Sequence, residues 1–461
     1  MSHGPSPLSH SAATRRLRCS SVAIDWLSVS VAWLIFDVVR YHIVGTGFDS
    51  AGAFLCSPKV LASQMLFPPV MLALYWLSGY YAAPLSCSRI STLISTATTA
   101  FAGTMLVLMA MLLNDLTPRL ADDYLLLGSL FGLLLTVVYI PRFILLTRVI
   151  RRFRRGQIIC RTAEVAVGCP TNLPHHCQSK GRMTIVMTGS AEEALKAAEA
   201  GQIDCFLLRQ ATGQPLEELM PAVATLLPAG MPIYLDRGHT PLTSRRSRHV
   251  DLGARPYPDL SRGGLTPSAR NFKRVGDVVA GTAAAVVTAP LVLLLAVAVK
   301  LTSPGPAFYL QRRVGLHRRP FYMIKLRTMV DGAEDRSGPA LSADGDPRVT
   351  PLGRLLRKYR LDELPQFINV LRGDMSIVGP RPERPFFAEC LARVAPLYTL
   401  VHQMRPGITS LGMVRYGYAS SIDEMVERLP FDLLYLENAG FIIDMKIIFH
   451  TIHTVAAGKG L

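Results

Sequence analysis

Four long apolar runs near the start of the chain constrain its fold more than any other feature. Each is close to the ~20 residues that a helix needs to cross the hydrocarbon core of a bilayer. The runs are Ser21–Val39, Val60–Tyr81, Leu93–Leu113 and Tyr124–Ile140. Half of the 461 residues are hydrophobic and only 18% are charged, which is too apolar for an ordinary soluble protein of this size. We therefore expect a transmembrane bundle of four helices over residues 20–150, after a cytoplasmic tail of residues 1–19.

The charges around these runs predict the orientation of the bundle. Arginines lie before the first run, between the second and third, and after the fourth. The acidic loop between the third and fourth runs contains Asp115, Asp122 and Asp123 with only Arg119. By the positive-inside rule, both ends of the bundle are cytoplasmic. Asp25 and Asp37 lie near the ends of the first run, so we expect them at the membrane interface. Residues 1–20 lack the pattern of a removable signal peptide.

Residues 151–236 differ in pattern from the apolar runs and predict a small α/β domain. Short β-like runs occur at Glu164–Val167, Met183–Thr188, Ile203–Leu208 and Pro232–Asp236, and helical stretches at Ser190–Ala200 and Leu216–Leu227. This alternation is typical of a parallel sheet. Only Gly168 follows the first β-like run, so a glycine-rich dinucleotide site is not supported. Residues 237–268 are rich in Arg, Ser, Pro and Gly and predict a linker.

The cysteines and histidines of the chain indicate neither a disulfide framework nor a zinc site. The eight cysteines lack the paired spacing of a secreted disulfide-rich protein, so we expect them to be reduced. One cluster combines residue types that bind zinc, namely Cys160, Cys169, His175, His176 and Cys177. Its spacing fits none of the usual zinc-finger patterns, and we expect no metal there.

A fifth apolar run, Val278–Val299, is long enough to cross the membrane but has an unusual centre. Pro290 lies in its middle, where the missing N–H and the ring would kink a helix. Both flanks are basic. An ordinary fifth span would place everything after residue 300 outside the cell, while the α/β domain stays inside. We instead expect a bent, re-entrant helix over residues 276–300 that enters the inner leaflet and returns.

The chain after residue 300 is dense in cations. A net charge of +16 fits nucleic acid, anionic lipid or a phosphate-bearing substrate. Lys325 and Arg327 alternate, so on a strand they would face the same way. The stretch GRLLRKYR (353–360) predicts a basic amphipathic helix suited to an anionic interface. These cations lie beside apolar runs instead of on a soluble face with stacking aromatics, which argues against a nucleic-acid binder.

The stretch RLDELPQFINVLRGDMSIVGPRP (360–382) places two adjacent acids, Asp362 and Glu363, among these cations. Apolar residues recur there at helical spacing, at Leu364, Phe367, Ile368 and Leu371. This spacing predicts a short helix with these residues inward. Pro365 is tolerated only in the first turn, so the acids would lie at the helix N-terminus and could cap it. Capping does not explain the surrounding cations or Arg381 on a rigid turn.

Several motifs then occur in a characteristic order. They are KRVGD (273–277), QRRVG (311–315), KLRTM (325–329), LDELPQFINVLRGDMSIVGPRP (361–382), RPGIT (405–409) and IDMKII (443–448). With the apolar run and its central proline, this region resembles the bacterial sugar transferase family, the monotopic polyprenyl-phosphate sugar-1-phosphate transferases. The N-terminal bundle and a degenerate Rossmann-like domain resemble the long members, which initiate exopolysaccharide or O-antigen synthesis. The resemblance implies a mainly α catalytic domain over residues 269–461.

The resemblance also implies a reaction, in which a hexose 1-phosphate passes from a UDP-sugar, UDP-glucose or UDP-galactose, to undecaprenyl phosphate with release of UMP. Asp362 would form a covalent phosphosugar intermediate, and Glu363 would hold Mg²⁺ with Asp362 or assist proton transfer. The residues expected to bind phosphate or substrate are Lys325, Arg327, Arg357, Arg381, Arg405 and Asp444. The expected partners are the UDP-sugar, undecaprenyl phosphate and the lipid bilayer, with a homodimer as one oligomeric option.

Two departures from the family pattern affect details. Ala289 precedes Pro290 where members commonly carry serine, and RPGITSLGMV has Ser410, Gly412 and Met413 where the common pattern has Gly, Ala and Gln. The second departure concerns a loop that could shape sugar or nucleotide recognition. We expect a bacterial inner-membrane protein with its catalytic domain on the cytoplasmic face. The alternative is a catalytically inactive membrane scaffold or nucleotide sensor of a polysaccharide assembly complex.

Overall fold

The computed structural model describes residues 8–456 apart from short internal segments. The segments left out are 45–46, 83–88, 115–119, 156, 169–182, 212, 237–248, 252–255 and 334–345. The chain forms two compact units. The first comprises Met1–Cys160, Ser179–Thr184 and Thr266–Asn271, and the second comprises Arg161–Gln178, Ile185–Leu265 and Phe272–Leu461. The cysteines and histidines from 169 to 177 that we considered for zinc lie outside the described residues.

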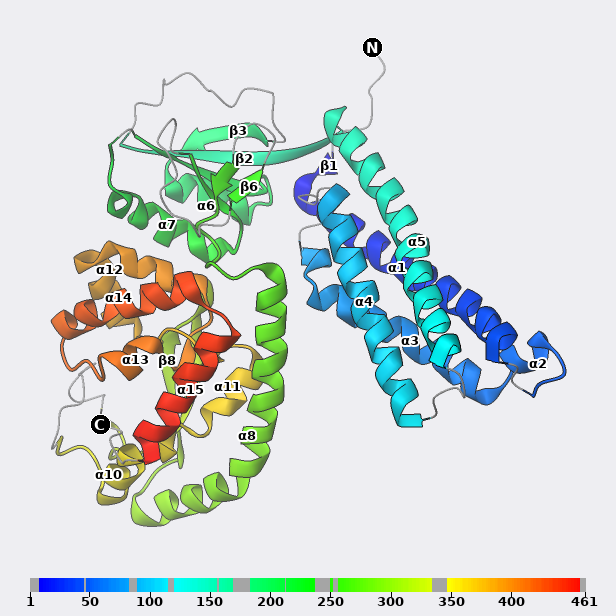
Figure 1. Ribbon diagram of the computed structural model, residues 1–461. Helices are drawn as coiled ribbons and strands as arrows, with labels where there is room; N and C mark the ends of the chain where they lie inside the picture. The colour runs from blue at the N-terminus through cyan, green and yellow to red at the C-terminus, as the bar shows by residue number, and fades with distance from the viewer. Residues whose placement is uncertain are drawn as a thin grey trace. The chain divides into compact units, whose positions relative to one another are not determined.

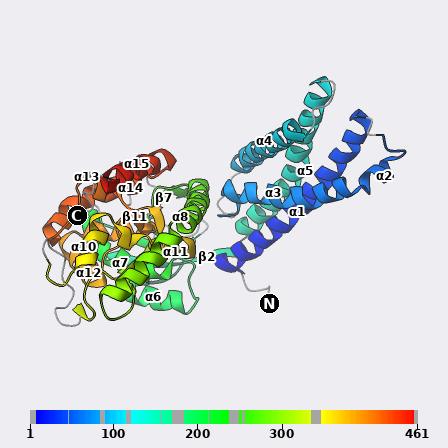
Figure 2. The same cartoon turned by 90° about the horizontal axis from the view of Figure 1, so that it is seen from below.

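The first unit is a helical bundle that confirms the predicted apolar helices. Its long helices are α1 (His10–Val44), α3 (Pro58–Leu77), α4 (Arg89–Asn114) and α5 (Leu120–Arg154), with α2 (Ala51–Leu55) and the 3₁₀ turn η1 (Tyr80–Ala82) between them. These long helices pack side by side (Figures 1 and 2). Their shared core includes Val29, Trp33, Met71, Leu130 and Leu134. Each long helix has the length and hydropathy needed to cross a membrane.

Asp25 belongs to a buried polar network between the helices of the bundle. It is completely buried and accepts hydrogen bonds from Arg142, Nε to Oδ1 at 2.8 Å and Nη2 to Oδ2 at 2.7 Å. Tyr81 donates a further hydrogen bond at 2.6 Å. Asp37 is also completely buried. An arginine 117 residues away in sequence thus supplies the charge partner of Asp25 inside the bundle, and the placement of Asp25 and Asp37 at the membrane interface stays a prediction.

The small α/β domain contains a parallel sheet. Its elements are β2 (Ile158–Val167), β3 (Met183–Gly189), α6 (Ala191–Glu199), β4 (Cys205–Gln210), η2 (Leu216–Leu219), α7 (Met220–Leu226), η3 (Leu227–Ala229) and β5 (Ile233–Asp236). Strands β2, β4 and β5 are parallel neighbours, β3 also pairs with β2, and β1 (Leu8–Ser9) pairs with the start of β2. The core contains Val165, Phe206, Leu208, Val223 and Leu235. This small parallel sheet was predicted correctly.

The described part of the predicted linker is packed chain. Strands β6 (His249–Asp251) and β7 (Pro256–Pro258) pair antiparallel. Tyr257 and Leu265 are buried, and the Leu260 N–H donates to the Ile233 carbonyl at 2.8 Å. Proline and glycine signalled turns in this region, but the backbone between those turns continues the hydrogen bonding of the sheet edge.

The C-terminal domain is mainly helical around two small sheets. Its order is α8 (Pro267–Thr302), β8 (Phe308–Val314), η4 (Leu316–Arg318), β9 (Pro320–Leu326), α10 (Pro351–Lys358), η5 (Leu361–Glu363), α11 (Gln366–Arg372), β10 (Ser376–Val378), α12 (Pro385–Val394), η6 (Pro396–Gln403), β11 (Gly407–Thr409), α13 (Leu411–Arg415), α14 (Ile422–Asn438) and α15 (Phe441–Ala456). Strands β8 and β9 form an antiparallel hairpin, with Tyr309 opposite Lys325. Strands β10 and β11 are parallel.

Helix α8 is a continuous helix that contains Pro290 and changes direction along its length (Figure 1). Most of its apolar side chains are exposed; only 11% of its most apolar stretch is buried. Its polar anchor is Asp277, which is buried and accepts hydrogen bonds from the Ser376 hydroxyl and the Ile377 N–H. A bent helix with an exposed apolar surface is consistent with a membrane-inserted segment.

Candidate functional site

Asp362 and Glu363 lie in the 3₁₀ turn η5, just before α11. Helix α11 begins at Gln366, and its N-cap is Pro365, which makes no side-chain capping hydrogen bond. The acids therefore do not cap this helix. The predicted inward face is also wrong, because Gln366, Asn369 and Val370 are buried while Ile368 is 42% exposed. A polar residue faces inward since the Asn369 side chain bonds to the β9 backbone, accepting from Ile324 N–H at 3.0 Å.

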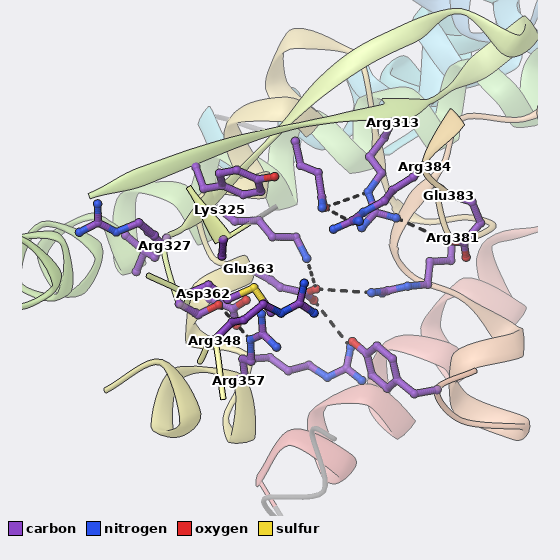
Figure 3. A pocket seen from close by; sticks show the side chains of 18 of the residues that line it. Arg313, Lys325, Arg327, Arg348, Arg357, Asp362, Glu363, Arg381, Glu383 and Arg384 are labelled. Carbon is purple, nitrogen blue, oxygen red and sulfur yellow. Dashed lines mark hydrogen bonds and ion pairs between the residues drawn. The ribbon is translucent and has the colours of Figure 1, made fainter. Parts of the chain in front are cut away.

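Both acids line a cavity of about 410 Å³ that is rich in cations (Figure 3). The hairpin β8–β9 and the residues after it supply one wall, and η5 with the end of α10 supplies another. The segment before α12 and the start of α14 close the remaining side. The charged residues of the lining include Arg313, Lys325, Arg327, Arg348, Arg357, Arg360, Asp362, Glu363, Arg381, Glu383, Arg384 and Arg428. Such a cavity suits a small, strongly anionic ligand.

Glu363 is the carboxylate that receives the nearby cations. Its Oε1 lies 3.0 Å from Lys325 Nζ and 3.9 Å from Arg381 Nη2, and its Oε2 lies 3.7 Å from Arg360 Nη1 (Figure 3). Burial raises the pKa of Glu363, but Lys325, Arg381 and Arg360 outweigh burial and lower this pKa to about 2. Glu363 is therefore ionised at neutral pH and holds the cations in place.

Asp362 has a different environment although it is the next residue. Burial raises the pKa of Asp362 above its ordinary value, and Glu363 raises it further, while Lys325 and Arg357 oppose this shift. Burial also lowers the pKa of Lys325. Neighbouring titratable groups whose pKa values are pushed in opposite directions are suited to different chemical roles. Here Glu363 organises charge, and Asp362 is the more basic carboxylate.

Tyr418 is a cavity residue that the sequence analysis missed. Its ring centroid lies 4.6 Å from the guanidinium carbon of Arg360 and 4.7 Å from that of Arg381. The ring therefore stacks with both guanidinium groups. Arg381 also donates to Met413 Sδ at 3.3 Å. Arg360 has a left-handed φ of 52°, a backbone conformation that these contacts support. Tyr418 gave no sequence signal because it lies in the irregular segment between α13 and α14, outside the motifs.

A second buried charge network borders the cavity and was also missed. Arg313 donates to Gln311 Oε1 at 2.6 and 3.0 Å and to the Pro382 carbonyl at 2.9 Å. Glu383 accepts from Arg428 Nη2 at 2.7 Å. Burial lowers the pKa of Arg313 to about 10. Gln311 and Arg313 belong to the QRRVG motif, which was the available signal for them.

Arg327 and Arg357, which were predicted to bind phosphate, line the same cavity as the acids. Arg357 Nε donates to Thr328 Oγ1 at 2.9 Å. Arg327 Nη2 donates to both the carbonyl and the hydroxyl of Ser303, each at 2.8 Å. The Nε and Nη1 atoms of Arg327 are buried and have no hydrogen-bond partner among the residues that the structure describes.

The other predicted site residues lie outside the cavity lining. Arg405 Nε donates to the Gly373 carbonyl at 2.9 Å. Asp444 contacts Lys273 Nζ at 2.6 Å and accepts from the Tyr435 hydroxyl at 2.7 Å. Pro290 lies within α8. The structure therefore brings together Asp362, Glu363, Lys325, Arg327, Arg357 and Arg381 but not Arg405 or Asp444.

The two acids fit a magnesium ion only if the substrate shares in binding it. Within the described ranges, no group of three or more His, Cys, Asp or Glu side chains could hold a metal. Mg²⁺ usually keeps several waters and is bound by one or two carboxylates together with substrate phosphates. Asp362 and Glu363 could provide these carboxylates, although Glu363 is already engaged by Lys325.

Residues 268–458 match the sequence model of a protein family that is described as bacterial sugar transferase. A UDP-N-acetylgalactosamine-undecaprenyl-phosphate N-acetylgalactosaminephosphotransferase of Aeromonas hydrophila is 43% identical over 41% of this chain and 44% of the relative. The UDP-glucose:undecaprenyl-phosphate glucose-1-phosphate transferase of Caulobacter vibrioides is 44% identical to this chain, over 39% of this chain and 68% of the relative. The enzyme of the same name from Escherichia coli K12 is 32% identical, over 60% of each chain. The matched regions thus span from under half to about two thirds of these relatives.

Proposed function

The chain belongs to the bacterial sugar transferase family, and we propose that it transfers a sugar 1-phosphate from a UDP-sugar to undecaprenyl phosphate and releases UMP. The observation that carries this proposal is the pair Asp362 and Glu363 in a cation-lined cavity, with pKa shifts in opposite directions. Relatives named for this type of reaction act on UDP-glucose or UDP-N-acetylgalactosamine. We propose a role at the start of exopolysaccharide or O-antigen synthesis.

In the proposed first step, a carboxylate oxygen of Asp362 attacks the β-phosphorus of the UDP-sugar. The bond between this phosphorus and the bridging oxygen breaks, and UMP leaves with the electron pair. In the second step, an oxygen of the lipid phosphate attacks the same phosphorus, and Asp362 leaves as a carboxylate. Lys325, Arg357 and Arg381 line the cavity where they would stabilise the phosphate charge.

The remaining chain residues position these groups. Glu363 holds Lys325, and Tyr418 stacks with Arg381, so both cations are fixed before substrate binds. When bound, Mg²⁺ would neutralise part of the diphosphate charge, and Asp362 with Glu363 would hold it. Arg405 and Asp444 would support the site from outside the cavity.

The apolar helices and the family indicate a membrane protein. We further propose that it lies in the bacterial inner membrane with its catalytic domain on the cytoplasmic face. In this arrangement α8 is re-entrant, and Pro290 allows its bend. A homodimer stays a prediction, which the molar mass of the solubilised protein would test.

The test is release of UMP by the full-length protein in detergent with undecaprenyl phosphate and Mg²⁺. The donors are UDP-glucose, UDP-galactose, UDP-N-acetylglucosamine and UDP-N-acetylgalactosamine, assayed separately. We expect continuous release of UMP only when the lipid acceptor is present, and a clearly higher rate with one of the four UDP-sugars. If the protein binds a UDP-sugar but releases UMP from none of the four, the scaffold or sensor alternative replaces this proposal.

A further inference from the structure

We propose that the small α/β domain supports the turn of the β8–β9 hairpin and thereby helps to position the cations of the cavity. Arg319 is the positioning residue at this contact. Most of the α/β domain, including η3, belongs to the same compact unit as the hairpin. The effect on catalysis rests on the proposed function, whereas the support of the turn is a property of the fold alone.

The turn at the tip of the hairpin has an unfavourable backbone conformation. The Leu316 carbonyl accepts a hydrogen bond from the Arg319 N–H at 3.2 Å, which closes a four-residue turn. Its central residues, His317 and Arg318, have left-handed φ values of 54° and 58°. Turns of this type favour asparagine and glycine at both positions, because most side chains are strained there. Contacts from outside the turn therefore have to hold its conformation.

The 3₁₀ turn η3 of the α/β domain supplies one of these contacts. The Arg319 guanidinium donates two hydrogen bonds to the Pro228 carbonyl, from Nε at 3.2 Å and from Nη2 at 3.1 Å. Gly230, the residue that follows η3, has a left-handed φ of 70°. A Cβ atom there would lie 3.1 Å from Arg319 Nη2 and 3.6 Å from His317 Nδ1. Glycine thus leaves room for both side chains of the turn.

The 3₁₀ helix η6 is a second connection between the α/β domain and the hairpin. Leu397 and Leu400 of η6 pack against the core of the α/β domain. Val401 of η6 belongs to the same buried cluster as Val314, the last residue of β8, and η6 also contacts η4. Helix η6 spans eight residues, although 3₁₀ helices of more than about four are uncommon, so its conformation also depends on packing from both sides.

The supported end of the hairpin also fixes the segment that carries Arg381. Val314 N–H donates to the Glu383 carbonyl at 3.0 Å. Arg313 Nη1 donates to the Pro382 carbonyl at 2.9 Å. Both bonds hold the backbone that directly follows Arg381, and Arg313 and Arg381 line the cavity (Figure 3). A shift of the turn would therefore move cations that have to be in place before the transition state forms.

The first measurement compares Arg319→Gln with the wild type, as full-length protein in detergent. The turn loses its polar contact with η3, so the backbone amides of the hairpin should exchange hydrogen about threefold faster or more, without substrate. With the preferred UDP-sugar, undecaprenyl phosphate and Mg²⁺, kcat for UMP release should fall roughly fivefold. The midpoint of thermal unfolding should change by less than about 2 °C, because Arg319 is exposed.

A second variant tests whether Arg319 acts through the turn. Arg318→Gly places glycine at a left-handed position, where it is unstrained, so the turn should keep its conformation without the contact to η3. Adding Arg318→Gly to Arg319→Gln should return kcat and amide exchange to within about twofold of the wild type. Arg319→Lys should give intermediate values, since it keeps a charged donor but loses the fork of the guanidinium.

The matched control is Arg312→Gln, which removes the same charge from the same hairpin. Arg312 is exposed on β8 and is not among the residues that line the cavity. Both kcat and amide exchange should stay within about twofold of the wild type. This control separates the contact with η3 from a general effect of surface charge.

Three results would overturn the proposal. Wild-type kcat and amide exchange in Arg319→Gln would mean that the turn needs no support. A loss of kcat that Arg318→Gly does not restore would mean that Arg319 acts by another route, and an equal loss in Arg312→Gln would assign the effect to surface charge. If the wild-type protein releases no UMP with any UDP-sugar, the proposed function fails, while amide exchange still decides whether the α/β domain supports the turn.

Discussion

Asp362 and Glu363 are chemically similar neighbours, and their surroundings give them different roles. Lys325, Arg360 and Arg381 lie within 4.0 Å of Glu363 and keep it ionised. Asp362 is buried at 7% exposure, and burial dominates its pKa. The sequence motif predicted both acids as site residues. Only the contact of Lys325 with Glu363 shows that Glu363 positions the cations and that Asp362 is the more basic carboxylate.

The first prediction compares isosteric changes of the two acids. Asp362→Asn should give a folded protein with no UMP release and no phosphosugar adduct, because the amide cannot form the acyl phosphate bond. Glu363→Gln should slow the reaction by loosening Lys325 and Arg381, yet still form some adduct. Intact-mass spectrometry after incubation with UDP-sugar and Mg²⁺ measures both. Near-normal turnover by Asp362→Asn would remove the covalent mechanism.

The second prediction concerns the acid limb of the pH profile. Asp362 must be ionised to attack, and its pKa is raised above 3.8, so kcat/KM should fall with acid at a pH above that value. Lys325 lowers this pKa because its charge favours the carboxylate. Lys325→Gln should therefore move the acid limb to higher pH. The control is Lys358→Gln, an exposed position where the limb should stay. A limb that moves to lower pH contradicts this account.

At the scale of elements, the sequence located helices better than it oriented them. Apolar spacing found α11 but assigned the wrong face, because Asn369 faces inward to bind β9 while Ile368 remains exposed. The periodicity rule assumes that apolar residues point into a protein core. Here this assumption fails, since a polar side chain makes the contact with β9 instead. The face of α11 thus depended on tertiary contacts with β9 that the local spacing does not show.

The third prediction concerns α8, whose exposed apolar surface and internal Pro290 support a re-entrant path. In a variant without native cysteines, Glu192→Cys lies before α8 and Asp423→Cys after it, both at exposed positions. Both should be protected from a membrane-impermeant maleimide in intact cells and react after permeabilisation. Asp49→Cys, between α1 and α2, should react in intact cells. Labelling of Asp423→Cys alone without permeabilisation would show that α8 crosses the membrane.

At the scale of the whole molecule, the features that the sequence did not predict depend on contacts between residues far apart in the chain. Apolar length and basic flanks were enough to predict the bundle helices, because the bilayer imposes both. The partner of Asp25 was not predictable, since Arg142 lies on another helix. In the sequence, Arg142 counted only as one of the cytoplasmic arginines that follow the fourth apolar run. Likewise, the composition of residues 256–265 hid their packing against β5, which Tyr257 and Leu260 establish.

The last prediction follows from that buried pair. Arg142 is 1% exposed, pairs with Asp25 through two hydrogen bonds, donates to Thr96 at 2.8 Å and stacks on Tyr75 at 3.9 Å. Arg142→Met would leave the Asp25 charge buried without its cation, which costs about 3–5 kcal/mol of unfolding free energy. Adding Asp25→Asn removes that charge and keeps an acceptor for Tyr81, so the double variant should regain at least about 1 kcal/mol.

Thermal unfolding of the full-length protein in detergent measures this difference between the single and double variants. Arg148→Met is the matched control, because Arg148 is exposed on the same helix as Arg142, and it should change stability by less than about 0.5 kcal/mol. The two substitutions should be non-additive, since a buried charge pair loses most stability when one charged partner remains. A double variant as unstable as the sum of Asp25→Asn and Arg142→Met would mean that the two side chains stabilise the bundle independently.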